Sequence, residues 1–287
     1  MIQLLGQGFL DLARQGKNAR WRYLLSLLAI LIGFLASVVL LKVFLDIERV
    51  GSAIILWGYL LDSILLIASL FVAIRFIHCR PFLSLITPHR SFDWKRATVG
   101  FGFFLMMLTV ASIIEAVIFP GRYQLTWNAK EFLKFLPIVL MLMPTWATME
   151  ELFFRGYLMQ SIGLKTRRPV IPIVVSSLIF TFIHLLNPEV KANPILVPAY
   201  YFGTGLLFAF VTLRDNRLEL AIGAHAGNNL FLGLFANYAD SVVATPSIFT
   251  ASKLDAQYAL GSFAVIAILF YVGMFAPRQA SSDNMAM

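Results

Sequence analysis

Eight long apolar runs divide this chain of 287 residues, and they constrain its fold more than any other feature. The runs cover residues 23–44, 54–77, 97–119, 132–158, 170–186, 195–213, 218–238 and 259–275. Most are close to the roughly 20 residues that a helix needs to cross a hydrocarbon layer about 30 Å thick. Only 13% of the residues are charged, against about 25% in ordinary soluble domains. The sequence therefore excludes a soluble globular protein and predicts an all-α, polytopic membrane protein with about eight transmembrane helices.

The positive charges concentrate in alternate loops. With the N-terminus inside, the loops on that side carry 15 Lys and Arg residues and the opposite loops carry 7. Because positively charged loops stay in the cytoplasm, we predict that both termini are cytoplasmic. The excess of Lys and Arg over Asp and Glu then indicates contact with anionic membrane lipid, and no nucleic acid partner is predicted.

The chain shows no repeat or linker that would divide it into several domains. We predict an amphipathic cytoplasmic lead-in over residues 1–22 and a single transmembrane domain over residues 23–276. The functional core of that domain is expected at about residues 132–238, and residues 277–287 are expected to be disordered. The single cysteine, Cys79, excludes an internal disulfide and a multi-cysteine metal site.

Ionisable and amide side chains within the apolar runs are the candidate functional residues, because an unpaired charge in lipid costs several kcal/mol. These residues are Asp62, Glu115, Glu150, Glu151, Arg155, His184, His225, Asn228 and Asn229. We expect Asp62 to be a hydrogen-bond partner between helices and Glu115 to reach the interface near Arg122. Neither is assigned a chemical role.

The fourth run contains the densest cluster of charges. Glu151 precedes Arg155 by four residues, which is the favourable order for an ion pair on one helix face. Glu150 lies roughly 100° further around the helix and has no cation three or four residues after it. We therefore interpret Glu151 and Arg155 as a supporting pair and Glu150 as a candidate general base.

The fifth and seventh runs supply two histidines and an amide. Phe180 lies one turn before His184, so that its ring can pack beneath the imidazole. His225 and Asn229 share a helix face, and Gly223 and Gly227, on another face of the same helix, would allow a neighbouring backbone to approach closely. We expect Asn228 to make a hydrogen bond between helices.

These side chains are a sufficient set for hydrolysing a peptide bond, because rough estimates of their depth allow them to meet in one buried site. Without a metal, Glu150 helped by His184 would take a proton from water, and His225 with Asn229 would stabilise the oxyanion. With a metal, Glu150, His184 and His225 would be the ligands of a divalent ion, most plausibly zinc, with an open water position. The sequence leaves both mechanisms open.

The segments EELFFR (150–155), FTFIH (180–184) and HAGNN (225–229) resemble the three ordered motifs of the CAAX prenyl protease 2 and bacteriocin-processing family, also called the Abi family. The resemblance implies an intramembrane endopeptidase with Glu150, His184, His225 and Asn229 as catalytic residues. It also implies a cavity open toward the cytosol and the membrane, and a peptide or protein substrate that can carry a lipid. A prokaryotic inner membrane is the expected location.

Two other function classes fit the composition. A proton-coupled transporter could use Asp62, Glu115 and Glu150 as a relay, although the sequence shows no inverted repeat. A catalytically silent membrane protein could keep this fold to bind a partner. Cleavage by the purified protein would distinguish the endopeptidase from both alternatives.

Overall fold

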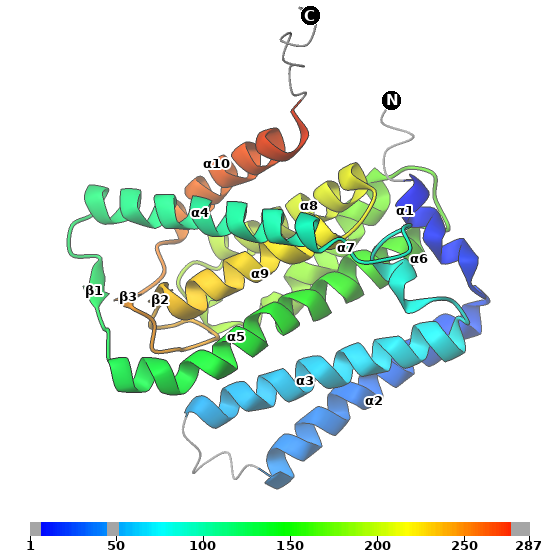
Figure 1. The fold of residues 1–287 in the computed structure, drawn as a ribbon, viewed down its shortest axis with the longest axis horizontal. Helices are drawn as coiled ribbons and strands as arrows, with labels where there is room; N and C mark the ends of the chain where they lie inside the picture. The colour runs from blue at the N-terminus through cyan, green and yellow to red at the C-terminus, as the bar shows by residue number, and fades with distance from the viewer. Residues whose placement is uncertain (1–6, 45–51, 277–287) are drawn as a thin grey trace, which may run out of the picture.

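The computed structural model describes residues 7–44 and 52–276, most of which lie in helices (Figure 1). The long helices are α2 (Arg20–Phe44), α3 (Ser52–Val72), α4 (Trp94–Ile118), α5 (Ala129–Glu151), α7 (Val170–His184), α8 (Leu196–Asp215), α9 (Glu219–Leu234) and α10 (Ala256–Phe275). The short helical segments are α1 (Gln7–Asp11), η2 (Leu12–Gln15), η3 (Ala73–Ile77), η4 (Phe82–Leu85), η5 (Leu152–Met159), α6 (Gln160–Gly163) and η6 (Pro188–Lys191). The predicted helical fold class is confirmed.

Each of the eight apolar runs contains one of these helices, but two of the helices are shorter than a full membrane span. In the described residues, six helical stretches are long and apolar enough to cross a membrane. Helix α7 has 15 residues and α9 has 16, fewer than the roughly 20 that a full span needs. The prediction of eight full-length spans is therefore not confirmed. The fourth run is longer than predicted, because α5, η5 and α6 form a continuous stretch of 35 residues.

The outer surface of the helical bundle is apolar. On α2, Leu24 is 69% exposed and Leu28 is 51% exposed, and leucines continue along the same helix. Such a surface is stable in contact with lipid, where each helix satisfies its own backbone hydrogen bonds. The protein is an integral membrane protein.

Helix α9 lies at the centre of the bundle, between α4 and α5 (Figure 1). Glycines allow its close approach to α4. A Cβ atom on Gly223 would overlap the carbonyl oxygen of Ala97, and one on Gly227 would lie 2.6 Å from the carbonyl oxygen of Phe101. The predicted packing through two small residues one turn apart is confirmed.

Helices α2 and α3 form a hairpin beside α5 (Figure 1). Within it, the Ser37 hydroxyl donates a hydrogen bond to Asp62 Oδ1 at 2.5 Å. This contact confirms the predicted role of Asp62 as a partner between helices.

A small sheet closes one end of the bundle, which we call the sheet end. Its strands are β1 (Tyr123–Leu125), β2 (Ala236–Tyr238) and β3 (Phe249–Ala251), in the order β1-β3-β2. Strand β3 pairs antiparallel with β1 and parallel with β2. The sequence analysis did not predict these strands, since three residues are too few to show a period of two.

The opposite end, which we call the basic end, is formed by residues 7–22, 78–96, 164–169 and 214–217. Two contacts tie these segments together. The backbone N–H of Lys17 donates to the carbonyl of His78 at 2.7 Å, and Arg217 pairs with Asp93 at 2.9 Å.

The described part of the predicted lead-in, residues 7–22, packs against the other segments of the basic end. Phe9 is fully buried and Leu10 is 1% exposed, and α2 begins at Arg20, before the predicted boundary at residue 22. The predicted disordered tail, 277–287, lies outside the described residues.

Candidate active site

The three sequence motifs meet where α5, α7 and α9 pack together. Glu150 Oε1 lies 3.8 Å from His184 Nε2, and Glu150 Oε2 lies 3.5 Å from His225 Nε2. Glu150 is only 6% exposed. The structure thus brings the predicted base and both predicted histidines into one group, with Asn229 one turn after His225 on the same helix.

Glu150 has a partner that the sequence analysis missed. The indole Nε1 of Trp146 donates a hydrogen bond to Glu150 Oε1 at 2.6 Å. Trp146 precedes Glu150 by four residues on α5, whereas the sequence prediction rested on the lack of a cation three or four residues after Glu150. The four-residue spacing was available in the sequence as a signal.

Glu151 is fully buried and links its partner Arg155 to the group around Glu150. Its Oε1 atom accepts hydrogen bonds from Arg155 Nη1 and from His225 Nδ1, both at 2.8 Å. Arg155 also donates to the carbonyl of Gly205 at 3.2 Å and lies over the ring of Phe180. The predicted pair of Glu151 and Arg155 is confirmed, and it additionally positions His225.

Hydrogen bonds to Nδ1 fix the tautomers of both histidines. His184 Nδ1 lies 2.7 Å from the carbonyl oxygen of Phe180, which can only accept, and His225 Nδ1 faces the Glu151 carboxylate. Nδ1 therefore carries the proton in the neutral form of each ring. Nε2 of each ring is left toward Glu150 as an acceptor. Phe180 lies against His184, with ring centroids 4.2 Å apart, as predicted.

A second set of side chains holds His184 from the other side. The ring of Tyr201 lies 4.7 Å from that of His184. The Tyr201 hydroxyl donates to Glu189 Oε1 at 2.6 Å and accepts from Asn187 Nδ2 at 3.0 Å. Glu189 is 2% exposed. The sequence analysis missed this group, because Glu189 lies outside the apolar runs, in the short segment η6, and nothing in its spacing relates it to His184.

The two asparagines of α9 form a hydrogen-bonded pair. Asn228 Nδ2 donates to Asn229 Oδ1 at 3.1 Å, and both residues line the same cavity. The expected hydrogen bond from Asn228 to another helix is replaced by this contact with its neighbour. Asn229 keeps its amide N–H groups available as donors.

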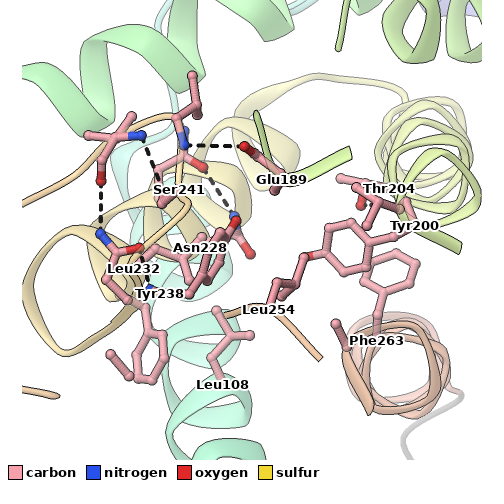
Figure 2. Close-up of a pocket in the computed structure, with 18 of the residues that line it drawn as sticks. Leu108, Glu189, Tyr200, Thr204, Asn228, Leu232, Tyr238, Ser241, Leu254 and Phe263 are labelled. Atoms are coloured by element: carbon pink, nitrogen blue, oxygen red, sulfur yellow. Dashed lines mark hydrogen bonds between the residues drawn. The ribbon is translucent and has the colours of Figure 1, made fainter. Parts of the chain in front are cut away.

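The site opens into a cavity of about 230 Å³. Figure 2 shows Tyr200 and Phe263 on one side of this space and Asn228 and Tyr238 on the other. The lining continues from His184 into the loops of the sheet end. This placement differs from the expected opening toward the cytosol if the basic end is the cytoplasmic end.

The two other candidate acids of the apolar runs, Glu115 and Asp62, have partners away from Glu150. Glu115 accepts from Arg122 Nη1 and from the Tyr123 hydroxyl, each at 2.7 Å, which agrees with its expected place near Arg122. Asp62 lies between α2 and α3 and does not line the cavity. Glu115 and Glu150 line the same cavity, whereas Asp62 lies apart from both, so the three acids do not form one continuous relay.

The ligand set for a metal has less support. Within residues 7–44 and 52–276, no group of three or more His, Cys, Asp or Glu side chains is arranged to hold a metal ion. Glu150, His184 and His225 are the residues that would bind a zinc ion, and we assign no step to a metal.

Comparison with known proteins identifies relatives of this chain. A family model described as type II CAAX prenyl endopeptidase, Rce1-like, matches residues 132–231, which contain all three motifs. An uncharacterized protein of Bacillus subtilis (strain 168), YyaK, is 33% identical over 258 residues, with 83% of this chain and 86% of the relative covered. No solved structure matches the chain.

Proposed function

The chain belongs to the Rce1-like family of type II CAAX prenyl endopeptidases, and we propose that it hydrolyses a peptide bond with water activated by Glu150. The observation that carries this proposal is the position of the Glu150 carboxylate between His184 Nε2 and His225 Nε2, at 3.8 and 3.5 Å. The substrate is a CAAX-type or bacteriocin-related peptide or protein, with or without a lipid. The matched relative from a bacterium favours a prokaryotic cell membrane as the location.

The proposed first step is attack of water on the scissile carbonyl carbon. Glu150 accepts one proton of the water as the new C–O bond forms, and His184 Nε2 accepts a hydrogen bond that orients the same water. The Trp146 N–H, 2.6 Å from Glu150 Oε1, holds the carboxylate in place. Glu150 then delivers its proton to the leaving nitrogen as the C–N bond breaks.

The negative charge that develops on the carbonyl oxygen needs hydrogen-bond donors. Asn229 donates from its amide, whose orientation is set by the hydrogen bond from Asn228. His225 donates from Nε2 when both ring nitrogens carry a proton, and the Glu151 carboxylate holds the ring by its hydrogen bond with Nδ1 at 2.8 Å. In this proposal Glu151 and Arg155 are positioning residues rather than catalytic ones.

The test uses protein purified in detergent and a set of internally quenched peptides, with and without a farnesylated cysteine. We expect Glu150→Gln to lower the cleavage rate by about 100-fold or more, in the range that a general base contributes, with the melting temperature unchanged. Glu131→Gln is the matched control, because Glu131 lies on the same helix and its side chain is 44% exposed. Cleavage by Glu150→Gln at the wild-type rate would refute the assignment of the base.

The same preparation separates the proposal from its alternatives. A metal requirement would appear as loss of cleavage on chelation, with recovery on adding zinc. Proton-coupled flux in liposomes without any cleavage would favour a transporter. A protein that does neither would favour a silent membrane partner.

A further inference from the structure

The two ends of the bundle differ in charge. The basic end and the helix termini beside it carry 14 of the 23 Lys and Arg residues of the chain. Sheet-end residues 119–134, 185–195 and 235–255 together carry five. Because positively charged loops remain in the cytoplasm, the basic end faces the cytoplasm and the sheet end faces the other side of the membrane.

The cavity belongs to the sheet end. His184 is the last residue of α7, and the lining continues past it through Glu189, Ser241 and Lys253. None of the lining residues in the described part of the chain comes from the four segments that form the basic end. The open side of the active site is therefore the side away from the positive loops.

Packed side chains close the route from the basic end. Between Glu150 and the basic end, the side chains of Glu151 and Arg155 are at most 1% exposed. Further along the same helical stretch, Gln160 is fully buried between Arg80, which donates to it at 2.8 Å, and the carbonyl of Ser84, to which it donates at 2.9 Å. A substrate entering from the basic end would have to displace this core.

On the basis of the proposed hydrolysis at Glu150, we propose that the active site is loaded from the extracytoplasmic face of the membrane. Its substrate is an extended peptide segment exposed on that face, such as part of an exported peptide or the outer end of a membrane-spanning one. A cavity of about 230 Å³ admits a few side chains and no folded domain. A prenylated C-terminus in the cytosol would meet the closed end of the protein.

The native cysteine provides a reporter for the test. Cys79 is exposed and lies at the basic end. Intact cells are treated with a membrane-impermeant maleimide before and after permeabilisation. We expect Cys79 of the wild-type protein to be labelled only after permeabilisation. The control variant, Lys165→Cys in a Cys79→Ser background, is expected to behave in the same way, because Lys165 is also exposed at the basic end.

Two variants in the Cys79→Ser background report on the cavity. Lys253→Cys lies at its exposed rim, and Ser241→Cys lies on its wall. We expect both to react in intact cells, with at least a tenfold excess over Lys165→Cys. Labelling of Lys165→Cys and Cys79 in intact cells, together with protection of both cavity cysteines, would overturn the proposal.

Labelling does not depend on catalysis, so the two proposals fail separately. A protein that cleaves peptides but labels in the reverse pattern keeps its proposed hydrolysis and moves its site to the cytoplasmic face. A protein that labels as expected but cleaves no peptide in detergent keeps its orientation and loses the proposed chemistry.

Discussion

Replacing Glu151 by glutamine tests the division of labour between the two adjacent acids. Glutamine retains an oxygen that can accept from both Arg155 Nη1 and His225 Nδ1, which now lie at 2.8 Å from Glu151 Oε1. It removes the negative charge beside a guanidinium that is 1% exposed. Opposite charges about 4 Å apart attract by about 4 kcal/mol at an effective dielectric constant of 20. Removing one partner of a buried pair costs about 3–5 kcal/mol.

The expected effect of Glu151→Gln is therefore a loss of stability as well as of activity. A cost of 3–5 kcal/mol corresponds to a fall in melting temperature on the order of 10 °C for a chain of this size. The measurement is the fraction of detergent-purified protein that remains monodisperse after heating. Glu150→Gln is the comparison, because it changes the same chemical group one residue earlier and is expected to leave the melting temperature unchanged.

An exchange of behaviour between the two variants would refute these assignments. A melting temperature of Glu151→Gln within about 2 °C of wild type would show that the Glu151 carboxylate is not needed to stabilise the buried guanidinium of Arg155. A large loss of stability in Glu150→Gln would show that Glu150 is itself a structural partner. In either case the assignment of base and positioning residue would have to be reversed or abandoned.

Three further predictions concern other parts of the structure. Gly223→Ala is expected to lose folded protein, because its Cβ would meet the backbone of α4, whereas Gly102→Ala, with nothing within 4 Å of its Cβ, keeps the wild-type yield on size-exclusion chromatography. Tyr201→Phe leaves a ring on His184 but removes the hydrogen bond to buried Glu189, so we expect a loss of about 1.5–3 kcal/mol in thermal unfolding. Backbone N–H donation and a nearby guanidinium hold the pKa of Asp255 below its usual range. Because its folded-state pKa is lowered, that stabilisation is present above about pH 4 and is lost as the pH falls through the folded-state value. The melting temperature of wild type should then fall more than that of Asp255→Asn between about pH 5 and pH 3.

The parts of the fold that could be predicted are those that depend on long periodic signals. Eight apolar runs identify the long helices, and the four-residue spacing of Glu151 and Arg155 predicts an ion pair that the structure contains at 2.8 Å. The same kind of spacing predicts the contact of Phe180 with His184. These relations lie within one helix, so they need no knowledge of how helices pack.

The parts that could not be predicted depend on contacts between distant segments. The hydrogen bond between Glu151 and His225 joins residues 74 positions apart. No sequence pattern in either helix predicts that these two residues are partners. Glu189 and Tyr201 are missed for the same reason, since Glu189 lies in η6 and Tyr201 in α8. The strands of the sheet end are three residues long, and their pairing depends on the loops that the helices bring together.

The shortness of α7 and α9 explains why water can reach a site inside the membrane. At 1.5 Å per residue, the 15 residues of α7 extend about 22 Å, which leaves roughly 8 Å of a 30 Å hydrocarbon layer uncrossed. Non-helical backbone at that depth is tolerated only where protein covers it or where it lines a water-filled cavity. The chain after His184 meets this condition, because Asn187 and Glu189 line the cavity. The helix therefore ends where its terminal histidine, a carboxylate on the neighbouring helix and water can meet, and a full-length α7 would remove both the cavity wall and the path for water.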